Sequence, residues 1–387
     1  MTLYTLTSIL VIAITFSLGY VTRAAQAPVP AQTASFSIFW ETWKLIDEHF
    51  YGDASDDTAR TYGAIQGSLS ALQDPYTRFV EPQAHKREEE ELRGSFGGIG
   101  AWVKRTPDGR IVLTPMEGRP AEQAGVHDGD ELIAVDGVTI TPEMALNEVV
   151  AMVKGEPGQT VTLTIRREDV QEPLIIPVKR AQIITESVAW RIVDQAPTVG
   201  YIQLRMFNER TADQVKTAIK ELKAQGAKSL IIDLRNNGGG LLSSAVDIAS
   251  QFLRDGVVLY DSKSSGEEKS YPVQGRGAAR DIPLVVLVND GTASASEIVA
   301  GAIQDRERGK LIGAQTFGKA SVQLLFDLSD GSSLHVTNAH WLTPNRRDIN
   351  GVGLTPDIVV EISDEDRQNN RDPQLERAIA ELQGNNE

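Results

Sequence analysis

The sequence predicts a multidomain α/β protein, and three changes of pattern along its 387 residues lead to this prediction. Apolar residues recur at helical spacing up to about residue 94. Between residues 95 and 180, five short strand-like segments surround one helix, and from residue 181 strands and helices alternate. A hydrophobic fraction of 41% can fill several cores. We therefore expect an N-terminal helical region, a small β domain and a layered α/β core.

Composition excludes several classes of function. The formal charge of −15 argues against nucleic acid as a partner, because phosphate binding needs clustered Lys and Arg. The chain has no cysteine, which excludes thiolate catalysis, disulfides and zinc sites of the Cys type. Its five histidines show no His-Glu-x-x-His pattern, so a zinc hydrolase is not expected. We expect neither a metal nor a cofactor.

The first 27 residues are predicted to be a signal peptide or a membrane anchor. Residues 3–21 form an almost uncharged apolar run of about 20 residues, long enough to span a bilayer. The small-x-small sequence Ala25-Gln26-Ala27 follows, a pattern that signal peptidase cleaves. Residues 28–34 read as a linker. An extracytoplasmic location is expected, either secreted or anchored to the outer face of the cytoplasmic membrane.

Residues 35–94 are predicted to be helical. One helix carries an apolar stripe that should pack against another surface, and a second runs from about residue 57 to residue 72. The acidic run Glu88–Glu91 is interpreted as a solvated face. The stripe residues are Phe39, Trp43, Ile46 and Phe50.

Residues 95–180 are predicted to form a small, partly open barrel. A helix should start at Thr141, with Pro142 at its first position, and end at Gly155. The expected strands cover residues 99–103, 110–113, 131–135, 161–166 and 174–178.

The core, residues 181–362, begins with βα units. A strand at 199–204 precedes a helix that a Thr211–Gln214 capping box should open. A second strand, at 229–234, leads into the glycine loop Arg235–Gly240 and another helix. The spacing of the loop fits neither the Walker lysine loop nor the dinucleotide fingerprint.

Two later segments suggest a nucleophile and its base. Asn289–Ile298 lies between a buried strand at 283–288 and a helix, where free backbone amides favour negative charge. A serine there needs a base, and Lys319 in the segment Thr316–Gln323 is the candidate. The neighbouring Phe317 could desolvate this lysine.

The end of the core is predicted to be a β-hairpin. Strands at 322–328 and 333–341 flank Asp330-Gly331, a hairpin signal. Residues 363–387 are polar and charged, and we expect them to be a surface tail with one short helix near residues 373–382.

The segments Gly-Thr-Ala-Ser-Ala-Ser-Glu (291–297) and Thr-Phe-Gly-Lys-Ala-Ser-Val-Gln (316–323) resemble the signature segments of the carboxyl-terminal processing proteases. The resemblance implies that Ser294 is the nucleophile and Lys319 the general base. It also implies that Gln323 supports the lysine, although four residues of extended strand span about 13 Å, so the chain would have to bend.

An oxyanion hole and a layered core are implied in the same way. The family has a Leu-Arg-x-Asn-Pro-Gly-Gly segment that supplies one amide, and here Gly238 replaces the proline. We assign this amide to Gly239 and the second to Ala295. The core resembles the crotonase and ClpP type of α/β fold.

The small β domain resembles a PDZ domain, in which a glycine-containing loop offers amides to the terminal carboxylate of a peptide that adds as a strand. We expect protein or peptide substrates with free C-termini, with the last apolar side chain held near Ile99 and the helix. The assigned residues are Gly97, Gly98, Ile99, Gly100, Leu146, Val149, Val150 and Val153.

Together these features predict an exported Ser-Lys endopeptidase that recognises C-terminal tails. Two alternatives remain open: an inactive PDZ-containing peptide-binding protein and a crotonase-like acyl-transferring enzyme. A Ser-His-Asp triad is disfavoured, because no histidine lies in a catalytic motif. The sequence leaves open a homo-oligomer, an activating adaptor and membrane association through residues 3–21.

Overall fold

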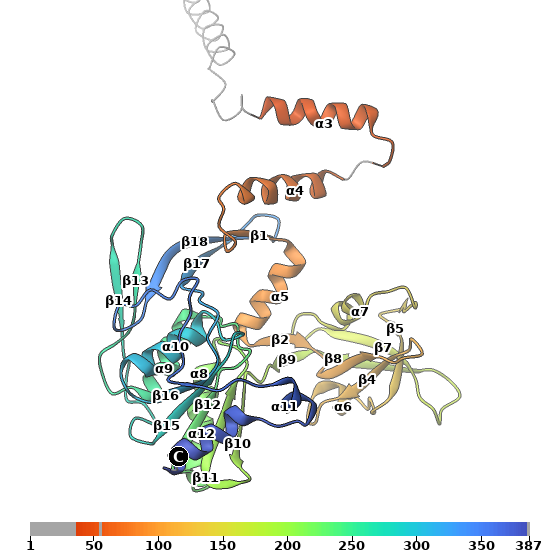
Figure 1. Ribbon diagram of the computed structural model, residues 1–387. Helices are drawn as coiled ribbons and strands as arrows, with labels where there is room; N and C mark the ends of the chain where they lie inside the picture. The colour runs from red at the N-terminus through yellow and green to blue at the C-terminus, as the bar shows by residue number, and fades with distance from the viewer. Residues whose placement is uncertain (1–35, 54–55, 385–387) are drawn as a thin grey trace, which may run out of the picture. The chain divides into compact units, whose positions relative to one another are not determined.

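A computed structural model describes residues 36–53 and 56–384 of the chain (Figure 1). The chain divides after Gly67 into two compact units. The predicted signal peptide or anchor lies outside the described residues. Among those that are described, no helix is both long and apolar enough to cross a membrane.

The first unit contains helix α3 (Ser37–His49) and most of helix α4 (Asp57–Ser70). No residue of α3 is buried, and Phe50 is 62% exposed. The predicted stripe is therefore not packed into a core within the described residues. One member of the stripe, Trp43, lies under the guanidinium of Arg60, 4.7 Å from the ring centroid.

The small β domain is an open antiparallel sheet of strand order β3-β4-β5-β7-β8, with β6 beside β5. Among the residues that the structure describes, strand β3 pairs only with β4, so one of its edges is free. The elements are β3 (Ala101–Arg105), β4 (Ile111–Pro115), α6 (Pro120–Gln123), β5 (Asp130–Val135), β6 (Val138–Thr139), α7 (Leu146–Val153), β7 (Thr160–Arg166) and β8 (Leu174–Lys179).

Helix α7 begins at Leu146, so the predicted start at Thr141 is wrong. The guanidinium of Arg105 donates hydrogen bonds to the carbonyl oxygens of Pro142 and Met144. These bonds hold the stretch in a non-helical conformation. The short helix α6 was not predicted. Next to the domain, helix α5 (Pro82–Arg93) precedes β2 (Ser95–Gly98), which pairs with β9 (Ala181–Ile184).

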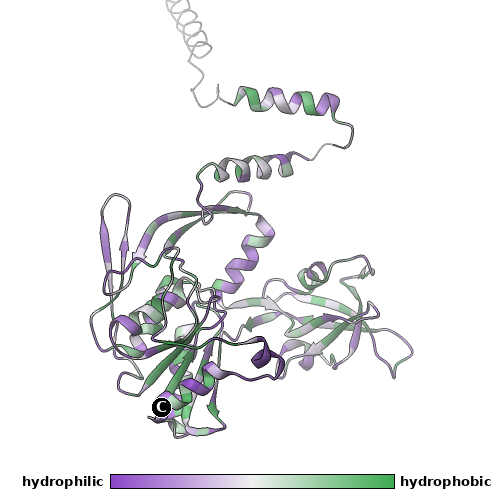
Figure 2. Cartoon of the chain, in the orientation of Figure 1, coloured by the Kyte–Doolittle hydropathy of each residue, from purple (hydrophilic) through white to green (hydrophobic). Residues whose placement is uncertain are grey.

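A six-stranded sheet of order β10-β11-β12-β15-β16-β19 forms the centre of the core. It is parallel except for the β10–β11 pair, and every residue of β12 and β15 is buried, as their apolar runs predict. Figure 2 shows these strands in the hydrophobic colour and α5 in the hydrophilic one. The strands are β10 (Val188–Val193), β11 (Ala196–Leu204), β12 (Ser229–Asp233), β15 (Leu284–Val288), β16 (Lys310–Gly313) and β19 (Ile358–Val359).

Helices cover both faces of this sheet. One hydrophobic cluster joins the sheet to α8 (Thr211–Ala224), α9 (Leu242–Phe252) and α10 (Ala295–Asp305). A second cluster joins the other face to α12 (Pro373–Gln383), in which Ala378 is fully buried. The prediction of a surface tail is thus wrong for α12, because its apolar residues complete the sheet's second face. The short helix α11 (Asp364–Gln368) precedes it.

The predicted capping box at the start of α8 is also wrong. Arg210 is the N-cap, and the buried Thr211 hydroxyl instead donates to the carbonyl of Met206 and accepts from the amide of Asn208. This threonine therefore fixes the loop before the helix.

A second sheet, of order β1-β18-β13-β14 with β17 also on β18, contacts α9 and α10 through β13. The predicted hairpin at Asp330-Gly331 is confirmed as β17–β18. Strand β1 joins the sheet from far away in the sequence, with Arg78 opposite His335. The strands are β1 (Arg78–Val80), β13 (Val257–Ser262), β14 (Glu268–Pro272), β17 (Ser321–Asp327) and β18 (Ser333–Leu342).

Candidate active site

Three loops of the core leave the central sheet at the same edge. Strands β12, β15 and β16 are parallel neighbours, so the loops that follow them emerge side by side at their carboxyl ends, where α/β sheets bind ligands. The glycine segment follows β12, the serine turn follows β15, and the lysine loop follows β16. The topology thus brings the predicted site residues of the core together.

Ser294 stands at the start of α10 in a strained conformation. Its φ of 56° and ψ of −118° lie outside the regions that L-residues favour, and such a conformation costs about 1–3 kcal/mol. Its hydroxyl makes no capping hydrogen bond, while its amide donates to Glu297 Oε2 at 3.0 Å. Strained strand-to-helix turns of this kind present a nucleophilic serine in other hydrolases.

The glycine segment packs tightly against the serine turn. A Cβ on Gly239 would lie 2.8 Å from the Ala293 carbonyl oxygen and 2.9 Å from Ser294 Cβ, so only glycine fits. The amide of Gly239 donates to Asn237 Oδ1 at 2.9 Å and is already engaged. Within the part of the chain that the structure describes, the amides of Gly238, Gly240 and Ala295 have no hydrogen-bond partner. Ala295 therefore fits its expected role as a donor, whereas Gly239 does not.

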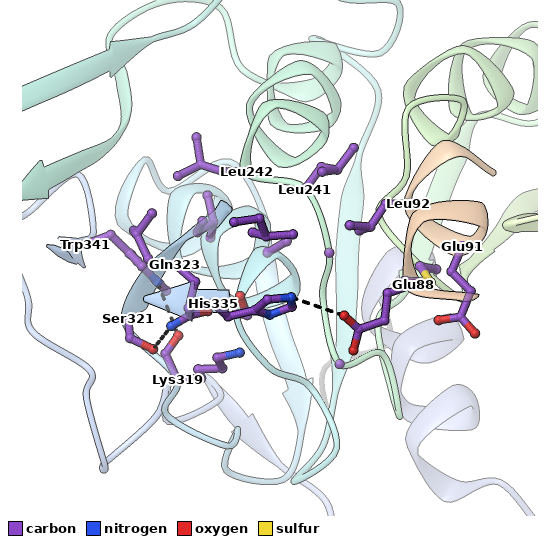
Figure 3. A pocket seen from close by; sticks show the side chains of 18 of the residues that line it. Glu88, Glu91, Leu92, Leu241, Leu242, Lys319, Ser321, Gln323, His335 and Trp341 are labelled. Carbon is purple, nitrogen blue, oxygen red and sulfur yellow. Dashed lines mark hydrogen bonds and ion pairs between the residues drawn. The ribbon is translucent and has the colours of Figure 1, made fainter. Parts of the chain in front are cut away.

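Lys319 and Ser294 line the same cavity of about 360 Å³ (Figure 3). Burial, with a smaller contribution from the charge of Arg78, lowers the pKa of Lys319 below its ordinary value. The lysine Nζ lies 4.9 Å from the ring centroid of Tyr76. Phe317, which was expected to desolvate the lysine, is 55% exposed and is not among the residues that line this cavity.

Glu297 connects the backbones of Ser294 and Lys319. This fully buried carboxylate accepts four hydrogen bonds: Oε1 from the Thr316 hydroxyl at 2.6 Å and the Gly318 amide at 2.7 Å, and Oε2 from the amides of Ser294 at 3.0 Å and Lys319 at 2.9 Å. No role was predicted for Glu297 from the sequence. The spacing Ser294-x-x-Glu297 is that of a capping box, a signal that could have identified it.

The carbonyl of Lys319 is fixed as well, because it accepts a hydrogen bond from the buried Trp341 indole at 3.2 Å. Both main-chain groups of the lysine are thus held. Only its side chain is left to move.

Gln323 lines the cavity together with Lys319, as Figure 3 shows. Lys319 precedes β17, and the strand has an irregularity between Val322 and Gln323, so the two residues are not separated by a regular extended strand. The side-chain amide of Gln323 donates to the Ser321 hydroxyl at 2.8 Å.

The rest of the cavity has an apolar wall and a charged wall. The charged wall contains His335, whose Nε2 lies 3.2 Å from Glu88 Oε2, while His340 on the same strand is exposed. Among the described residues, no group of three or more His, Asp or Glu could hold a metal. The apolar lining comes from Leu92, Met206, Leu241, Leu242, Ile298, Val322, Leu325 and Trp341, and the charged wall from Arg78, Glu88, Glu91 and His335.

The predicted peptide-binding residues of the β domain have different surroundings. Among the described residues, the amides of Ile99 and Gly100 next to the free edge of β3 have no partner, as a carboxylate-binding loop requires. Val149 and Val153 lie in the core of the domain instead of on its surface. Leu146 and Val150 are half-buried. Gly97 and Gly98 form part of the β2–β9 ladder.

Comparisons with known proteins agree with this architecture. Residues 198–360 match Peptidase family S41 and residues 111–167 match the PDZ domain. A carboxyl-terminal-processing protease of Synechocystis sp. is 38% identical over 325 residues, covering 83% of this chain and 76% of the relative. The carboxy-terminal processing protease CtpA of Bacillus subtilis is 33% identical, over 93% and 76% of the two chains.

One further relative and one solved structure are also similar to this chain. A C-terminal processing peptidase of Tetradesmus obliquus, named as chloroplastic, is 35% identical over 87% of this chain and 79% of its own. A solved structure of an S41-type protein from Bacteroides fragilis superposes with a TM-score of 0.52 at 17% identity, covering 87% and 93% of the chains, and supports the fold alone. By these relationships the chain belongs to the carboxyl-terminal processing proteases, the serine peptidases of Peptidase family S41 that carry a PDZ domain.

Proposed function

We propose that the chain is an exported endopeptidase in which Ser294 is the nucleophile and Lys319 the general base, and which selects substrates by their free C-terminus. One observation carries the catalytic part of this proposal. The strained serine and the half-buried lysine line one cavity, and a single buried carboxylate, Glu297, holds the backbone of both.

The chemistry follows from the two side chains. Ser294 Oγ attacks the scissile carbonyl while the neutral Lys319 Nζ takes the hydroxyl proton and later gives it to the leaving amine. Water then hydrolyses the acyl-enzyme by the reverse use of the same groups. The lowered pKa of Lys319 increases the neutral fraction that this work needs. Gln323, next to the lysine in the cavity, supports its side chain.

The oxyanion hole consists of the amides of Ala295 and Gly240. Gly239 is excluded because its amide is engaged by Asn237. Related proteases resembling this one have proline at the position of Gly238, and proline has no amide proton to donate. Gly240 is the remaining free donor of the segment, and it lines the cavity with Ala295. Two such donors stabilise the charge of a tetrahedral intermediate.

The PDZ domain captures the substrate's C-terminus. Strand β3 has a free edge to which an extended peptide can add, and the amides of Ile99 and Gly100 beside it are free to hold a carboxylate. Leu146 and Val150 on α7 are available to the last side chain. Selection then depends on a tail loose enough to add as a strand.

Export places this activity outside the cytoplasm. The apolar run at residues 3–21 and the following Ala25-Gln26-Ala27 support an exported chain, secreted or membrane-anchored. N-terminal sequencing of the cell-derived protein tests cleavage after Ala27, and retention of Met1 in a soluble cytoplasmic fraction contradicts export.

Mass spectrometry of an unfolded protein incubated with the leaderless enzyme tests the nucleophile. Ser294→Ala should abolish cleavage while leaving folding and peptide capture intact. Ser296→Ala is the matched control: its buried hydroxyl donates to the Asn237 carbonyl at 2.9 Å, so this variant loses about 1 kcal/mol of stability but keeps its chemistry. Turnover by Ser294→Ala would refute the assignment.

A further inference from the structure

Arg78 is brought to the active site by strand pairing that the sequence does not reveal. Its strand β1 lies beside β18, with Arg78 opposite His335. The Arg78 side chain lines the same cavity as Lys319, and its Nη2 lies 2.7 Å from Glu88 Oε1 on α5. A cation with one carboxylate partner thus faces the base.

The pKa of the Lys319 amine depends on the charged and titratable groups around it. Glu297 is occupied by backbone donors, and the Tyr76 ring covers Nζ without a charge of its own. The wall of the cavity adds further charged groups. Its charged groups are Arg78 on β1, Glu88 and Glu91 on α5, and His335 on β18, with His85 of α5 close to His335.

We propose that Arg78 is a positioning residue for Lys319: the guanidinium of Arg78 disfavours a second positive charge on the lysine. Glu88 limits this effect by pairing with Arg78. This inference rests on the proposed role of Lys319. It assigns a function to two residues that lie far from the serine and lysine segments in the sequence. Neither residue touches the reacting atoms in this account.

The electrostatics of the cavity support the proposal. Burial is the larger cause of the lowered pKa of Lys319, and the like charge of Arg78 adds to it. Because the Arg78 side chain is 54% exposed, water and salt screen its charge, so its contribution should be modest and should fall as ionic strength rises. The contribution from burial should not respond to salt in this way.

Glu88 divides its charge between two partners. It pairs with Arg78 at 2.7 Å and lies 3.2 Å from His335, whose pKa is lowered first by burial, against an opposing effect of Glu88. Removing the Glu88 charge leaves Arg78 without its carboxylate, and the lysine then faces more positive charge. Substitutions at positions 78 and 88 should therefore act in opposite directions.

The pH dependence of kcat/KM tests these directions. Arg78→Gln should move the rising limb to higher pH and lower kcat/KM on that limb about threefold, with recovery at the alkaline plateau. Glu88→Gln should move the limb to lower pH, and Arg78→Lys should restore the wild-type profile. Added salt should shift the wild-type limb towards that of Arg78→Gln.

The matched control is Arg346→Gln. Arg346 is 56% exposed and also pairs with a glutamate at 2.7 Å, but it lies outside the cavity. Its pH profile should equal that of the wild type. Shifts of the same sign at positions 78 and 88 would overturn the inference.

A second measurement separates this inference from the proposed function. In a Ser294→Ala background, the pH midpoint for modification of Lys319 by an amine-selective reagent, read by mass spectrometry, reports the neutral lysine directly. If Arg78→Gln raises this midpoint, the inference is supported. If the midpoint rises while the pH–rate profile does not move, the inference still holds but Lys319 is not the base. An unchanged midpoint overturns the inference whatever the rates show.

Discussion

The candidate active-site loops of the core and the free β3 edge of the PDZ domain are built in opposite ways. In the core, the groups that hold Ser294 and Lys319 have their partners: Glu297 accepts four hydrogen bonds, and both main-chain groups of Lys319 are held, while the free amides are confined to a few positions such as Gly240 and Ala295. At the PDZ edge, β3 has an unpaired side, and the neighbouring amides of Ile99 and Gly100 are free among the described residues. Chemistry requires fixed geometry, whereas capture of a strand requires unsatisfied backbone groups.

This contrast separates the expected effects of mutation. Damage to the buried network should lower both kcat and the free energy of unfolding, because unsatisfied buried groups are costly. Changes at the peptide-binding edge, or in the peptide's terminus, should act on capture and leave kcat nearly unchanged.

Glu297→Gln should have the largest effect. In glutamine, an NH2 group takes the place of one of the two carboxylate oxygens. Two of the four donors around residue 297 then face another donor instead of an acceptor. We expect kcat to fall about 100-fold or more and the free energy of unfolding by about 2–4 kcal/mol, measured by steady-state kinetics and urea denaturation.

Thr316→Val provides the graded comparison, since it removes one of these four hydrogen bonds and also the one that the Thr316 hydroxyl accepts from the Leu354 amide. Its losses should be smaller than those of Glu297→Gln. A Glu297→Gln enzyme with wild-type kcat would show that the carboxylate does not position the serine and lysine.

Changing the substrate's C-terminus should have an intermediate effect, confined to capture. Amidating the last residue removes the negative charge that the Ile99 and Gly100 amides would bind. We expect kcat/KM to fall severalfold or more at substrate well below saturation, with little change in kcat. Equal rates for the free and amidated forms of one peptide would show that the PDZ domain does not bind the carboxylate.

Gly238→Pro should have the smallest effect. No atom lies within 4 Å of a Cβ at this position, and Gly238 is not among the residues with positive φ, so proline should fit. Peptidase activity should stay within about twofold of the wild type. A loss of 100-fold, the effect of removing one oxyanion donor, would identify Gly238 as the donor in place of Gly240.

Much of the core could be predicted because its signals are local. The apolar runs of β12 and β15, the strand-to-helix turn at Ser294 and the Asp330-Gly331 hairpin depend on neighbouring residues, and the structure contains all of them. The sequence also indicated that the PDZ-like sheet would be open.

Features that depend on distant contacts were missed. The buried Thr211 hydroxyl has partners in the preceding loop, and α12 is polar by composition although its apolar face completes the central sheet. The pairing of β1 with β18 joins segments about 255 residues apart and brings Arg78 to the cavity. No spacing rule gives such a contact, because it depends on which sheet edge is open once the core has folded.

The pH dependence of kcat/KM for the wild type and Lys319→Arg tests the central claim most directly. The proposed mechanism uses the neutral lysine, so wild-type activity should rise with pH through the lowered pKa of Lys319 and show no inflection of a histidine base near pH 6.5. Lys319→Arg should be inactive at every pH, because arginine keeps the charge but cannot release its proton. An active arginine variant, or a wild-type profile that titrates as a histidine, would contradict the account.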